Sequence, residues 1–184
     1  MKLKTPKEYR EMEFRDFIFH LMCLLKPKSY AELGVKAGYT FNILSQLVVK
    51  AYAVDIKKQA SVIDRANTEF FECTTLEFYN RFKIRKEKID FIFVDADHNK
   101  IAVIKDAIMM KSFLTPYSGL MFLHDTYPVK EELLASGYCY NAWEAAKSLR
   151  EIEKDFEIVT IPGPWAGLSI LRYVPDNKHG WMDT

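Results

Sequence analysis

The chain contains five short apolar runs, and each of them ends abruptly in charged, hydroxyl or imidazole residues. The runs lie at residues 29–33, 51–54, 70–71, 89–94 and 120–123. In an open parallel sheet, ligands bind outside the carboxyl ends of the strands, at the point where the strand order reverses. Polar groups at every such end therefore predict one ligand site along a single edge of a sheet.

Hydrophobic periodicity predicts that strands and helices alternate along the chain. We expect strands at residues 29–33, 51–55, 70–73, 89–94, 120–123, 156–161 and 168–173, and helices at 6–25, 40–49, 59–67, 75–82, 100–113 and 141–153. A Pro-Gly-Pro turn at 162–164 joins the last two strands into a hairpin, so the last strand should be antiparallel. The pattern indicates a Rossmann-like, doubly wound α/β sheet of seven strands that is mostly parallel.

The length of 184 residues suits one compact domain. We divide the chain into an N-terminal helical segment at 1–28, a sheet domain at 29–174 and an irregular tail at 175–184. The net charge of +1 disfavours nucleic acid and anionic membranes as partners. Three cysteines without metal-type spacing, and the lack of a signal peptide or membrane-spanning run, predict reduced thiols and a cytoplasmic location.

A glycine pair follows the first strand, and a carboxylate follows the second. Gly34 and Gly38 flank a turn between a strand and a helix, where missing side chains let a ligand approach the backbone. Asp55 ends the next strand, where a carboxylate can accept hydrogen bonds from both ribose hydroxyls. The spacing Gly-x-x-x-Gly suits a nucleoside with an uncharged or amino-acid tail better than a pyrophosphate. We therefore expect a nucleoside-type ligand.

These segments resemble the ordered motifs of the class I S-adenosylmethionine-dependent methyltransferases. The resemblance covers residues 31–40, 51–55, 89–98 and 119–125, and the C-terminal hairpin fits the antiparallel seventh strand of that fold. Within the class, the chain is most similar to small-molecule and sugar O-methyltransferases related to macrocin O-methyltransferase and cephalosporin hydroxylase. The resemblance implies S-adenosylmethionine as cofactor and a small-molecule acceptor.

The resemblance also implies which residues border the cofactor. Glu32, Gly34 and Gly38 would line its methionine part, and Asp55 would hold the ribose. Thr74 and Thr75 would lie near the adenine, and Asp95 would border the cofactor from the fourth strand. A structural alternative stays open for the threonines, because Thr75 could simply cap the helix that follows it.

Acidic and imidazole side chains should converge beside this site. Asp95, Asp97, His98, His124 and Asp125 follow two neighbouring strands. By resemblance to metal-dependent O-methyltransferases, Asp95 and Asp125 would bind a divalent cation such as Mg²⁺ or Mn²⁺, and His98 would act as the general base. We interpret Asp97 as the N-cap of the next helix.

The segment around Asp125 departs from the family pattern, which leaves alternatives open. Thr126 stands where catechol-type enzymes carry Asn, and His124 stands where sugar enzymes carry an acidic residue. Imidazole is a poor Mg²⁺ ligand and favours Mn²⁺, Fe²⁺ or Zn²⁺. A metal requirement is therefore undecided. His124 is an alternative base, and a purely structural role for His124 and Asp125 in ordering the loop also remains.

The sequence favours methylation of a small-molecule or sugar hydroxyl, with two rival hypotheses. An NAD(P)-dependent oxidoreductase could also place Asp55 on a ribose, but the glycine spacing and the lack of a Tyr-x-x-x-Lys pair disfavour it. A non-catalytic nucleoside-binding domain would keep the pocket without the chemistry. The sequence shows no inserted cap domain, so we expect the pocket to be either open or completed by a second subunit in a homodimer.

Overall fold

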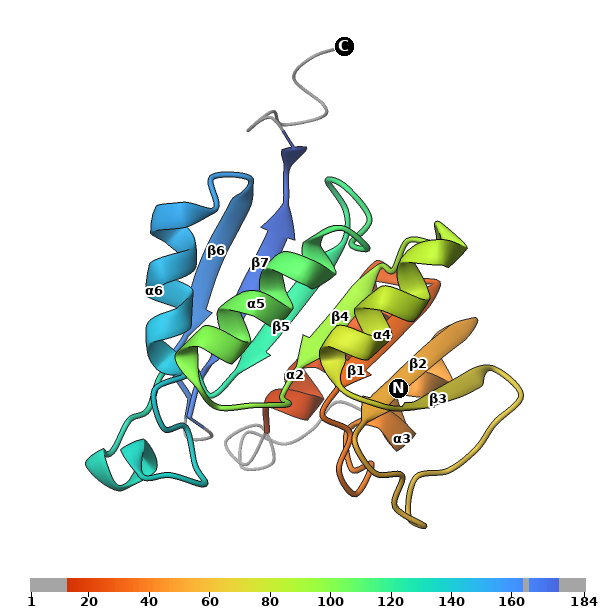
Figure 1. Ribbon diagram of the computed structural model, residues 1–184, viewed down its shortest axis with the longest axis horizontal. Coiled ribbons are helices and arrows are strands. Elements are labelled where there is room, and N and C mark those ends of the chain that lie inside the picture. The colour runs from red at the N-terminus through yellow and green to blue at the C-terminus, as the bar shows by residue number, and fades with distance from the viewer. Residues whose placement is uncertain (1–12, 164–165, 176–184) are drawn as a thin grey trace.

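The computed structural model describes residues 13–163 and 166–175, which form one sheet with helices on both faces (Figure 1). The strand order is β3-β2-β1-β4-β5-β7-β6. The strands are β1 (Ser29–Leu33), β2 (Lys50–Asp55), β3 (Thr68–Glu72), β4 (Phe91–Val94), β5 (Leu120–His124), β6 (Phe156–Ile161) and β7 (Leu168–Tyr173). The order reverses between β1 and β4, so this pair forms the topological switch point.

The strand directions confirm the predicted sheet. Strands β1 to β5 pair in parallel, whereas β7 is antiparallel to both β5 and β6. The strand β7 therefore lies between β5 and β6, two strands that run the same way. The fold is the mostly parallel, doubly wound sheet of seven strands with an antiparallel last strand that the sequence indicates.

Two helical layers cover the sheet. The helices α4 (Thr75–Phe82), α5 (Lys100–Lys111) and α6 (Trp143–Ile152) lie on one face, and α2 (Phe14–Leu25) and the short α3 (Phe41–Leu44) lie on the other (Figure 1). The central strand β4 shows why both layers are needed. Ile92 and Val94 belong to a first core, under α4, α5 and α6, and Phe91 and Phe93 belong to a second core, under α2 and α3. All four residues are buried, as expected for a central parallel strand.

The helix predicted at residues 59–67 is wrong. The segment is irregular, and its backbone is held by side chains: Asn42 Nδ2 donates to the Ser61 carbonyl, and the Ile63 amide donates to Asn42 Oδ1. Val62 is buried, whereas the neighbouring Ile63 is half exposed. A helix here would bury little apolar surface, so it would add little stability. Hydrogen bonds from side chains satisfy the backbone of the segment instead.

The helix predicted at residues 40–49 is shorter than expected. It consists of α3 followed by a 3₁₀ turn at Ser45–Leu47. Asn67 Nδ2 donates to the carbonyls of Ser45 and Val48, which satisfies backbone acceptors that a continued helix would use. Tertiary hydrogen bonds thus end this helix early, whereas the other predicted elements agree within a few residues at their ends.

Two of the predicted segments fall partly outside the described residues. The N-terminal helix is confirmed from Phe14 to Leu25, and its predicted first part at residues 6–12 lies outside them, as does the tail at 176–184. Within the part of the chain that the structure describes, no helix combines the length and the apolar character needed to cross a bilayer.

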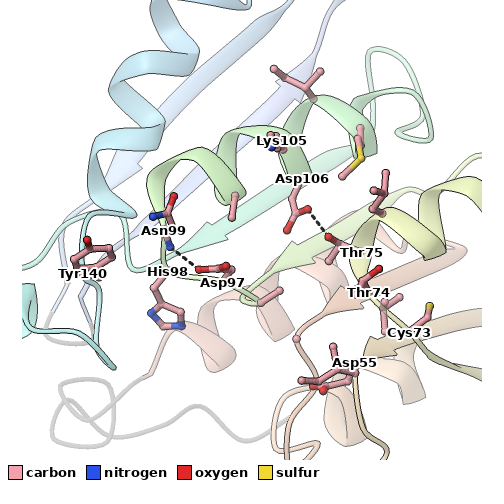
Figure 2. A pocket seen from close by; sticks show the side chains of 18 of the residues that line it. Asp55, Cys73, Thr74, Thr75, Asp97, His98, Asn99, Lys105, Asp106 and Tyr140 are labelled. Atoms are coloured by element: carbon pink, nitrogen blue, oxygen red, sulfur yellow. Dashed lines mark hydrogen bonds between the residues drawn. The ribbon is translucent and has the colours of Figure 1, made fainter.

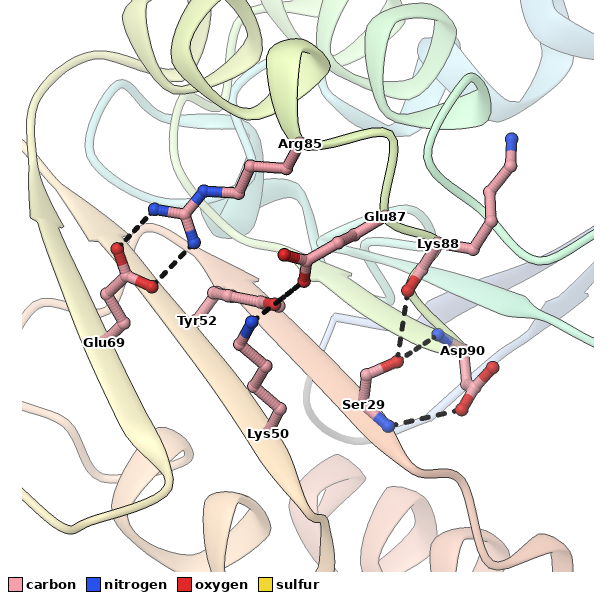
Figure 3. Close-up of polar contacts among 8 residues, drawn as sticks. All are labelled: Ser29, Lys50, Tyr52, Glu69, Arg85, Glu87, Lys88 and Asp90. Carbon is pink, nitrogen blue, oxygen red and sulfur yellow. Dashed lines mark hydrogen bonds and ion pairs between the residues drawn. The ribbon is translucent and has the colours of Figure 1, made fainter.

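Asp90 joins three segments at the amino ends of the parallel strands, opposite the end of the sheet that carries the predicted site. Its Oδ2 accepts hydrogen bonds from the amides of Lys28 (2.7 Å) and Ser29 (3.2 Å), and its Oδ1 accepts one from the Thr115 hydroxyl (2.8 Å). Figure 3 shows the bond between Ser29 and Asp90 beside a second ionic group at the same end of the sheet, in which Arg85 binds Glu69 through two parallel hydrogen bonds. The Asp90 side chain therefore fastens the start of β1 and the segment that precedes β5 to the start of β4.

Glu32 is a carboxyl group buried inside the second core. It is 2% exposed, and its Oε2 accepts a 2.5 Å hydrogen bond from the Tyr30 hydroxyl. Burial raises the pKa of Glu32 to about 8, with a further increase from the charge of Asp95 and a partial offset from the Tyr30 hydrogen bond. Glu32 is therefore mainly protonated near neutral pH.

We expect Asp90→Ala to lower the free energy of unfolding by about 1–3 kcal/mol, because it leaves two amides and a hydroxyl without their acceptor. Urea unfolding followed by circular dichroism measures the change. Asp64→Ala is the matched control, since Asp64 is an exposed carboxylate paired with Lys58 and should contribute little. Equal losses in the two variants would contradict the role assigned to Asp90.

We expect Glu32→Gln to stabilise the fold increasingly as the pH rises from about 4.5 to about 8. Over that range the unfolded chain ionises at position 32 while the folded protein holds the proton, so the wild type loses stability that the neutral amide retains. The gain at pH 8 should be on the order of 1–3 kcal/mol. Urea unfolding at pH 5 and pH 8 measures it.

Glu87→Gln is the control, because it should lower the free energy of unfolding where Glu32→Gln raises it. Hydrogen bonds from Tyr52 and Lys50 lower the pKa of Glu87, so its ionised form stabilises the fold above the unfolded pKa. This variant should lose about the same stability at pH 5 and at pH 8, because both values lie above the unfolded pKa of about 4.5. A Glu32→Gln effect that is the same at both pH values would show that Glu32 is ionised in the folded protein.

Candidate active site

A cavity of about 900 Å³ opens at the carboxyl ends of the parallel strands (Figure 2). Its lining includes six of the residues predicted from the sequence to lie at or beside the site, which are Gly34, Asp55, Thr74, Thr75, Asp97 and His98. These residues come from the ends of β1, β2, β3 and β4 or from the loops that follow. The edge of the sheet thus gathers polar groups in one hollow, as the positions of the apolar runs predict.

The glycine loop is shaped by contact with the loop after β4. Gly34 has φ +87°, and a Cβ at this position would lie 2.2 Å from the Asp95 carbonyl oxygen. Gly38 has φ +77°, and its Cβ would press on Asn42 and Val62 at 3.0–3.2 Å. Packing within the protein therefore requires a glycine at position 34, which also borders the cavity, whereas at position 38 the positive φ favours one.

Asp55 holds the glycine loop from the end of β2. Its Oδ2 accepts a 2.7 Å hydrogen bond from the Lys36 amide, and its Oδ1 accepts a 3.2 Å bond from the Lys57 amide. Each carboxylate oxygen has two lone pairs, so the group keeps acceptor capacity for hydroxyl groups in the cavity. Asp55 can organise the loop and bind a ligand at the same time.

The two threonines at the start of α4 have different roles, and Thr75 does not have the capping role considered for it above. Thr74, not Thr75, is the N-cap: its hydroxyl accepts from the Glu77 amide at 3.2 Å, and Glu77 accepts from the Thr74 amide at 2.9 Å. This reciprocal pair is a capping box. Thr75 does not cap the helix, and its hydroxyl donates a 2.6 Å hydrogen bond to Asp106 Oδ1.

The interpretation of Asp97 as the N-cap of α5 is also wrong. Asn99 is the N-cap, and its Oδ1 accepts from the Ile101 amide at 2.9 Å. Asp97 accepts from the Asn99 amide at 2.8 Å, which forms a turn before the helix begins. The loop from Asp97 to Asn99 therefore borders the cavity as a compact turn.

Two histidines and two carboxylates form one cluster beside the cavity. His98 Nδ1 lies 2.8 Å from Asp125 Oδ2, and His124 Nδ1 lies 3.2 Å from both Asp95 Oδ1 and Asp125 Oδ1. Asp125 has φ +59°, in the left-handed region that Asp tolerates better than most residues. This backbone turn directs its carboxylate back toward both imidazoles.

The charges within the cluster stabilise one another. Burial opposes a charge on His124, but the carboxylates of Asp125 and Asp95 outweigh it and raise the pKa of His124 to about 10. The carboxylate of Asp125 likewise raises the pKa of His98. Burial opposes the charge of Asp125 as well, yet the two histidines hold its pKa below the usual range. His124 is therefore an imidazolium near neutral pH.

The members of the cluster differ in their access to the cavity. Among the described residues that border it, His98 is the one member of the cluster. The ring of His124 packs against Phe14 from α2, with ring centroids 4.2 Å apart. One ligand atom from each of Asp95, His98 and Asp125 can be chosen so that all lie within 4.8 Å of one another, a grouping that could hold a metal ion.

The sequence interpretation missed Asp106, which borders the cavity from α5. The residue is 4% exposed, and burial raises its pKa to about 6 while the Thr75 hydroxyl opposes the shift. A usable signal was present, because Asp106 lies at the helical spacing of the buried residues Val103, Ala107 and Met110. A carboxyl group on the buried stripe of a helix indicates a specific partner.

The comparisons with solved structures show the same fold in several methyltransferases. An O-methyltransferase from Bacillus cereus in complex with S-adenosylhomocysteine (SAH) has 14% identity and a TM-score of 0.69, over 92% of this chain and 82% of that chain. TomG, an O-methyltransferase from Streptomyces achromogenes in complex with S-adenosylmethionine (SAM), has 13% identity and a TM-score of 0.68, over 94% and 82%. At such identities the likeness concerns the fold alone.

A third structure contains a metal ion. MycE, a methyltransferase of mycinamycin biosynthesis in complex with Mg, SAH and mycinamycin VI, has 15% identity and a TM-score of 0.60, over 86% of this chain and 49% of that chain. A search of the curated proteins found no match. A family model described as a methyltransferase domain matches residues 31–126, just over half of the chain, and this span includes the glycine loop, Asp55 and the Asp/His cluster. The chain therefore belongs to this family of methyltransferase domains.

Proposed function

We propose that the protein transfers a methyl group from SAM to a hydroxyl group of a small molecule. The observation that carries the proposal is the cavity at the switch point of a methyltransferase domain, bordered by the glycine loop, a ribose-type carboxylate and an imidazole. Structural neighbours in complex with SAH or SAM support it. Near-neutral charge gives no indication of a nucleic-acid acceptor.

The residues at the ends of β1 and β2 fit the nucleoside part of the cofactor. Asp55 would accept hydrogen bonds from the ribose hydroxyls, and the exposed apolar side chain of Ile56, which also borders the cavity, would cover one face of the base. Gly34 would let the methionine part pass close to the backbone. Glu32 and Gly38 would act through the shape of the loop, because Glu32 is buried against Tyr30 and Gly38 against Asn42.

His98 is the best-placed general base. It borders the cavity, and the carboxylate of Asp125 lies 2.8 Å from its Nδ1, which would orient the ring with Nε2 available to accept a proton. Methyl transfer is an in-line displacement, so the protein chiefly aligns the hydroxyl oxygen with the methyl carbon. His124 is less suited to this role because its charge is held by two carboxylates.

A divalent cation fits the same cluster as an alternative arrangement. Asp95, His98 and Asp125 would hold it, and a set of one imidazole and two carboxylates favours Mn²⁺ or Fe²⁺ over Mg²⁺. A bound cation would make the acceptor hydroxyl more acidic. In that arrangement His98 would be a ligand, and the carboxylates would be shared between the cation and His124.

The acceptor would enter from the side of the cavity formed by the segment after β5. Ser136, Gly137 and Tyr140 border the cavity there, and the Asn141 side chain accepts a 2.7 Å hydrogen bond from the Lys100 amide, which fastens this segment to the start of α5. Tyr140 is half exposed and has φ +44°. A small acceptor fits this opening, and both a homodimer that completes it and a cytoplasmic location stay predictions.

SAH should bind the purified protein with a dissociation constant below about 100 μM, or roughly 5.5 kcal/mol. We expect Asp55→Asn to weaken binding at least tenfold, because the amide replaces an acceptor for the ribose hydroxyls by a donor. Isothermal titration calorimetry measures both, with Asp64→Asn as the matched control and NAD as the competing ligand. Binding of NAD without SAH would instead favour an oxidoreductase.

His98→Gln should lower the rate of methyl transfer by about 10²–10⁴-fold while SAH binding changes less than about threefold. Release of SAH from SAM is measured with a panel of hydroxylated small molecules, once with Mn²⁺ and once with EDTA. His20→Gln is the control, since His20 lies on α2 and bonds to the Asp16 carbonyl. Loss of activity in His124→Gln but not in His98→Gln would assign the base to His124. SAH binding without transfer to any acceptor of the panel would favour a non-catalytic domain.

A further inference from the structure

A network of hydroxyl groups, formed by Thr160, Ser169 and Thr126, links Arg150 on α6 to the segment after β5. Arg150 Nη2 donates to the Thr160 hydroxyl at 2.8 Å, and the hydroxyl oxygens of Thr160 and Ser169 lie 2.8 Å apart. The Ser169 hydroxyl donates to Thr126 Oγ1 at 2.9 Å. Ser169 is fully buried and Thr126 is 4% exposed, so this hydroxyl network lies partly in the interior. The proposed chemistry uses none of its members.

The register of the antiparallel strands brings the hydroxyl groups together. Thr160 on β6 lies directly opposite Ser169 on β7, and Ser169 lies directly opposite Leu123 on β5. Side chains of directly opposite residues stand on the same face of a sheet. The hydroxyl network therefore crosses the strands on the face that α6 covers, and it reaches Thr126 just beyond the end of β5 (Figure 1).

The donors of the hydroxyl network all point the same way. A guanidinium group can only donate, so the Thr160 oxygen accepts from Arg150. Ser169 has one hydroxyl proton and gives it to Thr126, so Thr160 must donate to Ser169. Thr126 in turn directs its proton to the Leu123 carbonyl at 3.4 Å. Each hydroxyl is thus both donor and acceptor, and in such a series each hydrogen bond strengthens the next.

The end of the β6–β7 hairpin holds the same segment by its backbone. The Tyr127 amide donates to the Ala166 carbonyl at 2.7 Å. Gly167 has φ +81°, and a Cβ at this position would lie 2.3 Å from the Tyr127 Cβ. Thr126 and Tyr127 are therefore both fixed against this hairpin, directly after Asp125 in the chain.

Asp125 depends on such support because its backbone is left-handed. Its φ of +59° is a conformation that a residue other than glycine keeps only where the surrounding structure holds it. This conformation places Asp125 Oδ2 2.8 Å from His98 Nδ1 and Asp125 Oδ1 3.2 Å from His124 Nδ1. Asp125 and Thr126 share one planar peptide group, so a shift of Thr126 would also move the carboxylate that orients His98.

We infer that Ser169 is a positioning residue, whose hydroxyl fixes Thr126 and thereby the carboxylate of Asp125 that orients His98. This inference rests on the proposed function, in which His98 is the general base. Ser169 is not among the described residues that border the cavity, so it would act through Asp125 and not on the substrate. Loss of its hydroxyl should therefore slow methyl transfer without weakening the binding of the cofactor.

Ser169→Ala should lower kcat about tenfold, and the dissociation constant of SAH should change less than about threefold. The same substitution in the His98→Gln variant should change kcat less than about twofold, because the group through which Ser169 acts is already lost. Ser45→Ala is the matched control and should keep kcat within about twofold in both backgrounds. Ser45 is also fully buried, but its hydroxyl has no hydrogen-bond partner within the described part of the chain.

The ring signals of the histidines test the same link without turnover. Labelling the four histidines with ¹⁵N gives ring nitrogen resonances by NMR, and His98→Gln and His124→Gln assign the two rings of the cluster. Ser169→Ala should move the resonances of both rings. Thr160→Val, which removes the neighbouring hydroxyl with little change of shape, should move them less, and Ser45→Ala should leave them in place.

Two results would overturn the inference and leave the proposed function intact: unchanged ring resonances in Ser169→Ala, or an equal loss of kcat in the wild-type and His98→Gln backgrounds. A wild type that neither binds SAH nor transfers a methyl group would end the proposed function. The ring resonances would then still decide whether the hydroxyl network positions the cluster. If Ser169→Ala lacks cooperative urea unfolding, Thr160→Val decides the assignment by the same two measurements.

Discussion

The close contact between the loops after β1 and β4 is the constraint on which the site depends. The Asp95 amide donates to the Leu33 carbonyl at 2.9 Å, and Gly34 leaves room for the Asp95 and Ala96 backbone where any side chain would collide. Strand order reverses at this pair, so the two loops diverge to opposite faces of the sheet. Their divergence opens the cavity, and their contact fixes which residues face it.

Buried ionisable groups surround this contact, and each has a partner that compensates its burial. Glu32 remains protonated against Tyr30, whereas Asp125 remains ionised because two imidazoles face it. Asp106 lies between these cases, with one hydroxyl donor and a moderately raised pKa. Such groups cost stability in an apolar core unless their partners are well placed. Their concentration at one edge of the sheet is consistent with a site built for binding and proton transfer.

Sequence patterns predict those parts of the molecule that depend on local or periodic signals. The seven strands, the antiparallel last strand and the convergence of Gly34, Asp55 and His98 follow from apolar runs and from the positions where they end. The predicted helix at 59–67 failed because side-chain bonds from Asn42 satisfy that segment without a helix. The cap assigned to Asp97, and the cap left open as an alternative for Thr75, were off by one or two residues, since several neighbouring polar side chains can cap the same helix end.

The sequence by itself determined the class of fold, the edge of the sheet that carries the site and the chemical types gathered there, because strand periodicity and strand ends are local properties. Only the tertiary structure decided which of these side chains contact one another and which of them border the cavity. It placed His124 between Asp95 and Asp125 and left His98 bordering the cavity. It also brought Thr75 of α4 against Asp106 of α5, residues 31 positions apart in the chain. Such pairings depend on how helices pack across the sheet, and that packing arises from the sum of many apolar contacts rather than from any local pattern.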